Sequence, residues 1–254
     1  FFVSHRLPLA IEAIKRKKKV ILIGKNTGCF KDLEKVGIKC FDLNIERSGI
    51  NPFKEIRILN TLIKLYKEIN PDLIHHITIK PSIYGSIALR KSKLKAKVVN
   101  AITGLGYNFI NNRLFSLNKK VLTLLILYAF RNKNVNFIFQ NPDDLSFYDN
   151  LGLIDNNFTI IKGSGVDETI FKNSNKKNNK KIKVVLVARM LKDKGVIEFI
   201  NAANLLREKY EKKLEFILVG GIDNYNPAKI SKKSLNNLCD KDYIIWLGHQ
   251  TDIK

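Results

Sequence analysis

Short apolar runs alternate with longer segments of helical periodicity along most of the chain. The runs have the length and composition of buried strands. They occupy residues 19–24, 37–43, 72–77, 97–102, 135–140, 158–167 (a strand and its loop), 182–188, 214–221 and 243–248. Helical patterns occupy residues 1–19, 51–69, 83–91, 121–131, 141–148 and 196–210. Strands that alternate with helices predict an α/β fold whose parallel sheets carry helices on both faces.

Two of the expected helices begin at recognisable capping residues. Asn51 stands before Pro52, so the asparagine side chain can cap the helix while the proline occupies its first turn. Pro71 ends the same helix. At residues 141–148, either Asn141 or Asp143 is a suitable cap. These positions fix where the two helices start.

The alternation divides into two domains, which we place at residues 1–158 and 159–254. A polar, charged stretch at residues 173–181 has no apolar period and is expected to be a surface loop. No strand precedes the first helix, and residues after 182 supply one βαβ unit and one further strand. We therefore expect the chain to be a fragment that lacks the first strand of one domain and the end of the other.

The charge balance favours an anionic partner. Lys and Arg outnumber Asp and Glu by 45 to 23, which gives a formal net charge of +22. Nucleic acid, an acidic membrane surface or a phosphorylated substrate would each suit this surplus. Lysine is also spread through most segments beside much asparagine and isoleucine, which fits a genomic base composition equally well. Residues 15–19 leave the same choice open, between a solvated helix end and a patch for anionic lipid headgroups.

Cysteine use fits a reducing compartment, and hydropathy argues against a membrane span. Cys29, Cys40 and Cys239 are odd in number and far apart, so a disulfide scaffold or zinc site is not expected. We see no signal peptide. The most apolar run, residues 121–130, is about half the length that spans a bilayer and is interpreted as a buried core helix. We expect a cytoplasmic protein with at most a peripheral membrane association, and no metal or other cofactor.

The segment VARMLKDKGV carries the strongest local signal. Arg189 lies where a buried strand meets a loop, and Lys194 follows at the start of a helix. Ligands of open α/β sheets bind beyond the carboxyl ends of strands, where helix N-termini favour phosphate. Arginine adds bidentate recognition and lysine adds a point charge. Together they suit a diphosphate, although two surface cations in a lysine-rich chain would look the same.

Five segments in order resemble glycosyltransferase family 4, which has the GT-B fold of two Rossmann-like domains facing across a cleft. VARMLKDKGVIEFINAANLL is similar to the family's GRL-x-x-x-KG segment, with Ala188 in place of glycine. SGVD before Phe171 resembles NGVD-x-x-x-F. The family's PD-x-x-H strand end is matched by PDLIHHITIKP, and its T-x-HG-x-G loop by VVNAITGLG. The helix after the family's first strand is similar to FFVSHRLPLA. Among members, HHITIKP, NAITGLGY and QNPDD look most like enzymes that extend lipid-diphosphate-linked sugars.

The resemblance implies roles for particular residues. Arg189 and Lys194 would be catalytic, because they would stabilise the departing donor diphosphate. The donor-binding set implied is Gly163, Gly165, Asp167, Arg189, Lys194, Gly220, Gly221 and Leu247. The acceptor and sugar side implied is His75, His76, Lys80, Thr103 and Gly104. Residues 1–158 would then bind the acceptor and residues 159–254 the nucleotide-sugar.

Two departures limit the resemblance. The family's histidine in T-x-HG falls on Thr103, and His75 or His76 is a candidate to supply an imidazole instead. An equally good alternative is that one histidine is buried and hydrogen-bonded while the other is exposed. The family's paired glutamates would lie beyond Lys254.

The resemblance implies a retaining glycosyltransferase that moves a sugar from a UDP-linked donor to a lipid-linked or polysaccharide acceptor. Bacterial surface glycans such as capsule or O-antigen are the expected products, made at the cytoplasmic face of the inner membrane. An anionic membrane surface is an expected partner, and nucleic acid is not. The alternatives are a nucleotide-sugar epimerase of GT-B shape, or a basic nucleic-acid-binding protein.

Overall fold

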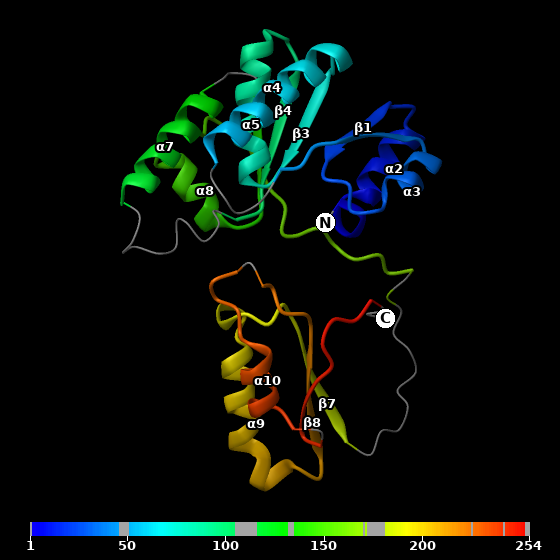
Figure 1. Ribbon diagram of the computed structural model, residues 1–254, viewed down its shortest axis with the longest axis vertical. Coiled ribbons are helices and arrows are strands. Elements are labelled where there is room, and N and C mark those ends of the chain that lie inside the picture. The colour runs from blue at the N-terminus through cyan, green and yellow to red at the C-terminus, as the bar shows by residue number, and fades with distance from the viewer. Residues whose placement is uncertain are drawn as a thin grey trace. The chain divides into compact units, whose positions relative to one another are not determined.

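The computed structural model describes residues 2–45, 51–104, 116–131, 135–169, 171, 181–224, 226–240 and 242–251. The chain forms two compact units, Phe1–Gly165 and Val166–Lys254 (Figure 1). They divide a few residues after the expected boundary, because β6 (Phe158–Ile160) pairs with a strand of the first unit. All strand pairs within the described residues are parallel. This confirms the predicted α/β class with parallel sheets.

The amino-terminal part of the first unit forms a small parallel sheet of β1 (Val20–Gly24) and β2 (Ile38–Asp42). The single helix expected before β1 is divided at Arg6 into α1 (Phe2–His5) and α2 (Leu7–Lys15). A helix that was not predicted, α3 (Phe30–Lys35), connects the two strands. A cluster of apolar side chains from α2, α3 and β2 covers the sheet: Ala10, Phe30, Leu33 and Ile38.

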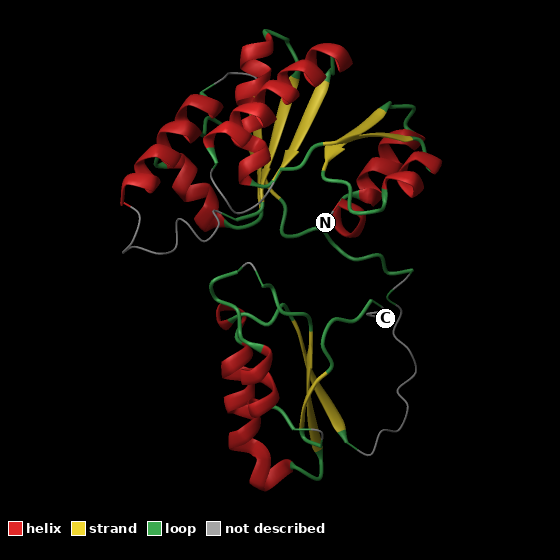
Figure 2. Ribbon diagram, viewed as in Figure 1, coloured by secondary structure: helices red, strands yellow, loops and turns green. Residues whose placement is uncertain are grey.

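The rest of the first unit is built on a four-stranded sheet in the order β3-β4-β5-β6. Its strands are β3 (Leu73–Ile77), β4 (Lys97–Ile102), β5 (Val135–Phe139) and β6. Its helices are α4 (Pro52–Ile69), α5 (Ile79–Ser92), α7 (Ser116–Phe130) and α8 (Pro142–Asp149) (Figures 1 and 2). The core is aromatic at its centre, where Phe130, Phe137, Phe139 and Tyr148 pack with ring centroids 5.4–5.9 Å apart.

The predicted helix caps are confirmed. The Asn51 side chain accepts hydrogen bonds from the backbone N–H groups of Phe53 and Lys54 at the start of α4. Asn141, and not Asp143, caps α8 by accepting from the N–H of Asp144 at 2.8 Å. In both helices the residue after the cap is proline, whose missing N–H costs nothing in a first turn.

Helix α7 corrects one expectation. Residues 121–130 were interpreted as a buried core helix, and Ile126, Ala129 and Phe130 are indeed buried. Leu124, however, is 65% exposed, and Tyr128 is 45% exposed. A run that is apolar on every side carries little information about which side faces the core. None of the helices in the described part of the chain has the length and hydropathy of a membrane span.

The second unit is a three-stranded parallel sheet of β7 (Ile182–Val187), β8 (Leu214–Val219) and β9 (Ile244–Trp246), in that order. Helices α9 (Val196–Tyr210) and α10 (Lys232–Leu238) connect the strands and lie on the same side of the sheet in Figure 1. The expectation of helices on both faces is therefore wrong for the described part of this unit, where Val185 and Val187 of β7 are 50% and 59% exposed. The helical spacing predicted the bounds of α9, whereas α10 was not predicted. Val196, Ile200 and Ala203 of α9 are buried against the sheet.

Asp240 fastens the turn between α10 and β9. Its Oδ1 accepts hydrogen bonds from the N–H groups of Asp242, Tyr243 and Ile244, and its Oδ2 accepts one from Arg207 of α9. Burial alone would raise the pKa of Asp240, but these hydrogen bonds hold that pKa well below its usual range. Because Arg207 also lies over the Tyr243 ring at 4.7 Å, this cluster joins α9 to β9.

A glycine at the end of β8 allows β7 and β8 to approach closely. A Cβ atom at Gly220 would lie 1.8 Å from the carbonyl oxygen of Ala188, and Gly220 has φ +151°. A Cβ atom at the neighbouring Gly221 would meet His249 at 3.4 Å, an ordinary contact. Trp246 donates its indole N–H to the Gly220 carbonyl at 3.0 Å, so the single tryptophan reports on this contact.

We predict that Gly220→Ala destabilises the second unit by about 3 kcal/mol, because the strands must separate to admit the methyl group. Urea unfolding followed by Trp246 fluorescence measures this. Gly221→Ala is the matched control and should change stability by less than about 1 kcal/mol. Equal midpoints for the two variants would contradict the prediction.

Candidate functional site

The loop that follows β7 is fixed to its neighbours by buried side chains and backbone hydrogen bonds. Met190 and Leu191 are fully buried. The N–H of Met190 donates to Gly221 O, its carbonyl accepts from Ile230 N, and the N–H of Lys192 donates to Ala228 O, all at 2.9–3.0 Å. The loop backbone is therefore held in place while its cationic side chains remain in solvent.

Arg189 is the first of these cations, and it pairs with a residue that the sequence did not single out. Its Nη1 donates to Oδ2 of Asp223 at 2.5 Å, with the side chains 51% and 26% exposed. Asp223 lies in the loop after β8, so the ion pair spans the carboxyl ends of two adjacent strands. An exposed pair of this kind contributes little to stability. Its main effect is to hold the guanidinium at the strand ends.

Lys194 lies on the same loop. It ends a short 3₁₀ turn, Lys192–Lys194, which lies directly before the start of α9. Gly195 follows with φ +73° and precedes α9 at Val196, with no side chain capping the helix. The first N–H groups of any α-helix lack intrahelical partners and attract anions. Lys194 is exposed just before this helix end.

Gly220, Gly221 and Leu247 follow β8 and β9 at the same edge of the sheet as Arg189. Gly220 has a structural reason to be glycine, because it packs on the backbone of Ala188 and donates its N–H to Gly248 O at 2.8 Å. Leu247 is 49% exposed, and its N–H donates to Leu218 O. Five of the eight predicted donor-binding residues thus share one edge: Arg189, Lys194, Gly220, Gly221 and Leu247.

The other three predicted donor-binding residues lie elsewhere in the chain. Gly163 and Gly165 belong to the first unit and have φ +82° and +70°, a conformation that favours glycine. Asp167 belongs to the second unit, where its Oδ1 accepts from the backbone N–H and the hydroxyl of Thr169. The structure gives Asp167 a turn-forming role, and its donor role stays a prediction.

His76 is buried in a complete hydrogen-bond network. Asn100 Oδ1 can only accept, so His76 Nδ1 donates to it at 2.7 Å, and Nε2 accepts from the Tyr66 hydroxyl at 2.9 Å. The Asn100 amide in turn donates to Ser86. A Cβ atom at Gly85 would lie 2.0 Å from His76 Nε2, so the ring lies directly on helix α5. This agrees with the structural alternative for one histidine of the pair.

His75 points to the other face of β3. The structural alternative expected the second histidine to be exposed, but His75 is half-buried. Its Nε2 is buried without a hydrogen-bond partner among the described residues, and so is Nε of Arg6. Burial lowers the pKa of His75, and the positive charge of Arg6 lowers it further. Arg6 also donates to the Ser164 hydroxyl at 3.4 Å. Unlike His76, His75 has a ring nitrogen without a hydrogen-bond partner among the described residues, and its role on the acceptor side stays a prediction.

Lys80 was predicted to lie on the acceptor and sugar side. It lies in the first turn of α5 and forms a half-buried ion pair with Glu55 of α4 at 2.8 Å. Its ammonium group also lies 5.5 Å from the centre of the Tyr84 ring. Burial raises the pKa of Tyr84, and its contact with Glu55 raises it further. A phosphate would have to compete with Glu55 for this cation.

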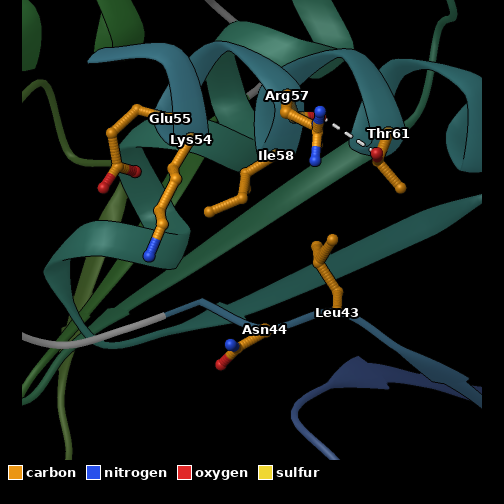
Figure 3. Close-up of a pocket in the computed structure, with 7 residues that line it drawn as sticks. All are labelled: Leu43, Asn44, Lys54, Glu55, Arg57, Ile58 and Thr61. Atoms are coloured by element: carbon orange, nitrogen blue, oxygen red, sulfur yellow. Dashed lines mark hydrogen bonds between the residues drawn. The ribbon is translucent and has the colours of Figure 1, made fainter. Parts of the chain in front are cut away.

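Glu55 also lines a pocket of about 280 Å³ between the end of β2 and the first turns of α4. Figure 3 shows Lys54, Glu55, Arg57, Ile58 and Thr61 of α4 across from Leu43 and Asn44. The pocket contains none of the predicted site residues.

Thr103 and Gly104 follow β4 and are half-buried. Gly104 has φ +132°, with open space where a Cβ would lie. Thr78 follows β3, the strand next to β4 in the sheet. Its φ of +73° is strained for a β-branched residue. Backbone strain of this kind is concentrated at binding sites. Within the described residues no three His, Cys, Asp or Glu side chains are grouped as metal ligands.

Comparisons with known proteins identify the family to which the chain belongs. The family model for "Glycosyl transferase 4-like" proteins matches residues 1–141. A Campylobacter jejuni protein, N,N'-diacetylbacillosaminyl-diphospho-undecaprenol alpha-1,3-N-acetylgalactosaminyltransferase, is 31% identical over 274 residues, covering 99% of this chain and 70% of that protein. The chain therefore belongs to the glycosyl transferase 4-like family.

Solved structures show the same fold. A glycosyltransferase from Rickettsia africae has a TM-score of 0.65 at 17% identity, covering 97% of this chain and 64% of that one. Anabaena HepE, in complex with UDP and glucose, has a TM-score of 0.68 at 16% identity, covering 97% and 66%. This chain thus spans just under two thirds of each. The predicted GT-B fold class is confirmed.

Three residues of the site regions were missed by sequence reasoning: Arg6, Glu55 and Asp223. Each acts through a side chain far away in the sequence, since Asp223 pairs with a residue 34 positions earlier and Glu55 with one 25 positions later. Asp223 closely follows the glycine pair at the end of a predicted strand, and that position was the available signal.

The His76 network predicts a pH dependence of stability. Burial lowers the pKa of His76 from 6.5 to about 4. Between pH 6.5 and pH 4, His76 is therefore protonated in the unfolded chain but stays neutral in the folded chain. The free energy of unfolding falls as the pH falls from 6.5 towards 4. We expect a loss of about 2 kcal/mol between pH 7.5 and pH 5 from this residue.

Hydrogen exchange of the β3 and β4 amides at the two pH values measures the effect on the first unit. His76→Gln is the control, because the amide side chain can still donate and accept but does not titrate. It should show a smaller difference between the two pH values. An equal difference in wild type and variant would assign the pH dependence to other groups.

Proposed function

We propose that this protein is a retaining glycosyltransferase that moves a sugar from a UDP-linked donor to a lipid-diphosphate-linked acceptor in the synthesis of a bacterial surface glycan. The 31% identity to the Campylobacter transferase over 99% of the chain supports this most directly. That relative transfers N-acetylgalactosamine to a diphospho-undecaprenol-linked sugar, as its name states. An N-acetylhexosamine donor is therefore the first to test.

The donor diphosphate is assigned to the edge of the second unit that carries Arg189 and Lys194. Two exposed cations on a fixed loop, beside the free N–H groups that begin α9, suit the charge of a diphosphate. Anabaena HepE binds UDP on the same fold, which supports a uridine nucleotide. Asp223 would keep the Arg189 side chain near the strand ends before the donor arrives.

In the reaction, the bond between the sugar C1 and the β-phosphate oxygen breaks, and the acceptor hydroxyl oxygen bonds to C1 on the same face. The hydroxyl proton passes to the departing β-phosphate oxygen, so no protein nucleophile is needed. Negative charge grows on the diphosphate as the bond breaks. Arg189 and Lys194 would stabilise that charge, a preorganised electrostatic effect that often supplies much of the rate enhancement.

The acceptor is assigned to the first unit, at the carboxyl ends of β3 and β4. Thr103, Gly104 and the strained Thr78 directly follow these strands, and His75 lies two residues before the end of β3. His76 supports this region structurally and does not contact the acceptor. The lipid part of the acceptor would bring the protein to the cytoplasmic face of a membrane.

A product assay separates the proposal from a nucleotide-sugar epimerase of the same shape. The protein is incubated with UDP-N-acetylgalactosamine, with and without a lipid-diphosphate-linked sugar. A transferase releases UDP and extends the lipid only when the acceptor is present. Interconversion of the donor sugar without an acceptor would instead establish an epimerase.

We predict that Arg189→Ala lowers the rate of acceptor extension by about 10²–10³, because one stabilising contact to the leaving group is lost. Lys212→Ala is the matched control. Lys212 is exposed and lies just before β8, at the opposite edge of the same sheet. Its removal changes the net charge equally and should leave the rate within about twofold, as expected for a distant surface change. Equal losses in the two variants would refute the role given to Arg189.

A further inference from the structure

Helix α7 presents an apolar stripe to solvent. Val121, Leu124, Leu125 and Tyr128 are 50%, 65%, 39% and 45% exposed. Their spacing of three, four and seven residues places them on one face of the helix. The opposite face is packed into the core through Phe130 and its neighbours. The stripe is therefore a surface feature of a helix that is firmly attached to the unit.

The segment that contains α7 has only positive charge. Between Leu73 and Pro142 the sequence has eleven Lys or Arg residues and no Asp or Glu. Five of these cations lie within eight positions at the end of α5 and the start of β4, and all five are exposed: Arg90, Lys91, Lys93, Lys95 and Lys97. In the described part of the chain none of the five forms a salt bridge.

Arg90 joins the group of cations to the apolar stripe. Arg90 lies over the Tyr128 ring at 4.7 Å and donates to the Tyr128 carbonyl at 3.0 Å. Helices α5 and α7 lie side by side in Figure 1, in agreement with these contacts. Lys120 is exposed at the other end of the stripe, next to Val121. The exposed apolar side chains thus have cations at both ends.

We propose that this surface, the α7 stripe with the Arg90–Lys97 cations, docks the protein on an anionic lipid bilayer. A bilayer offers negative headgroups to the cations and an apolar layer just beneath them to the leucines. Tyrosine suits the boundary between the two layers. A second copy of this chain fits less well, because two such surfaces would bring like charges together. The docking rests in part on the proposed function, since a lipid-linked acceptor lies in a membrane.

The test measures binding of the purified protein to vesicles by co-sedimentation. Vesicles contain phosphatidylcholine alone or with about one third phosphatidylglycerol. Wild type should bind the anionic vesicles, and higher salt should weaken the binding by screening. Leu124→Glu should weaken it by about tenfold or more, because a charge replaces an inserted apolar side chain.

Leu205→Glu is the matched control. Leu205 is 86% exposed on α9 of the second unit, so the same substitution is made on another helix surface. Its vesicle binding should equal that of wild type, and circular dichroism should show all three proteins folded. Equal loss in both variants, or no loss in Leu124→Glu, would overturn the proposal. So would a wild-type dimer that becomes monomeric in Leu124→Glu while neither protein binds vesicles.

A water-soluble, short-chain acceptor separates this proposal from the proposed function. If docking is correct, Leu124→Glu transfers sugar to the short-chain acceptor at the wild-type rate but extends a vesicle-bound acceptor more slowly. Vesicle binding without transfer to either acceptor would overturn the proposed function and leave the docking intact. Transfer to the short-chain acceptor without vesicle binding would overturn the docking proposal and leave the proposed function intact.

Discussion

Parallel strand pairing is the constraint on which the site depends. Parallel strands must be joined by crossovers, so successive strands of a sheet point the same way and their carboxyl ends meet at one edge. In the second unit this brings Arg189, Asp223 and Leu247 to one edge, although they are far apart in the sequence. Gly220 strengthens the constraint, because the absence of a side chain lets the ends of β7 and β8 touch.

The two kinds of polar group in the structure have different uses. The His76 network is buried, neutral and complete, so it stabilises the first unit and is closed to ligands. The cations of the β7 loop are in solvent on a backbone that is held by buried neighbours. Charges in such a position cost little to maintain and can meet an anionic ligand without rearrangement of the backbone, although the ligand must compete with Asp223 for Arg189. His75 differs from His76 because its buried Nε2 has no hydrogen-bond partner among the described residues.

Sequence patterns predicted the elements that carry local signals. The bounds of β4 and α9 follow from strand-like and helical runs, and α4 and α8 begin at asparagine caps followed by proline. Helices α3 and α10 are short and carry few apolar residues, so they lack such a signal. The exposed face of α7 could not be predicted from an apolar run. The pairing of Lys80 with Glu55 depends on how α4 and α5 pack, which only the folded structure reveals. Sequence reasoning brought together candidate residues that follow strand ends, and it missed residues whose partners are distant in the sequence.

The proposed function requires the second unit to recognise a diphosphate through the loop after β7. Calorimetric titration of the protein with UDP, UMP and uridine tests this most directly. UDP should bind at least about tenfold more tightly than UMP, because only the β-phosphate completes the contact with the two cations. Equal affinities for UDP and UMP would contradict it, since recognition would then rest on the nucleoside and its first phosphate alone.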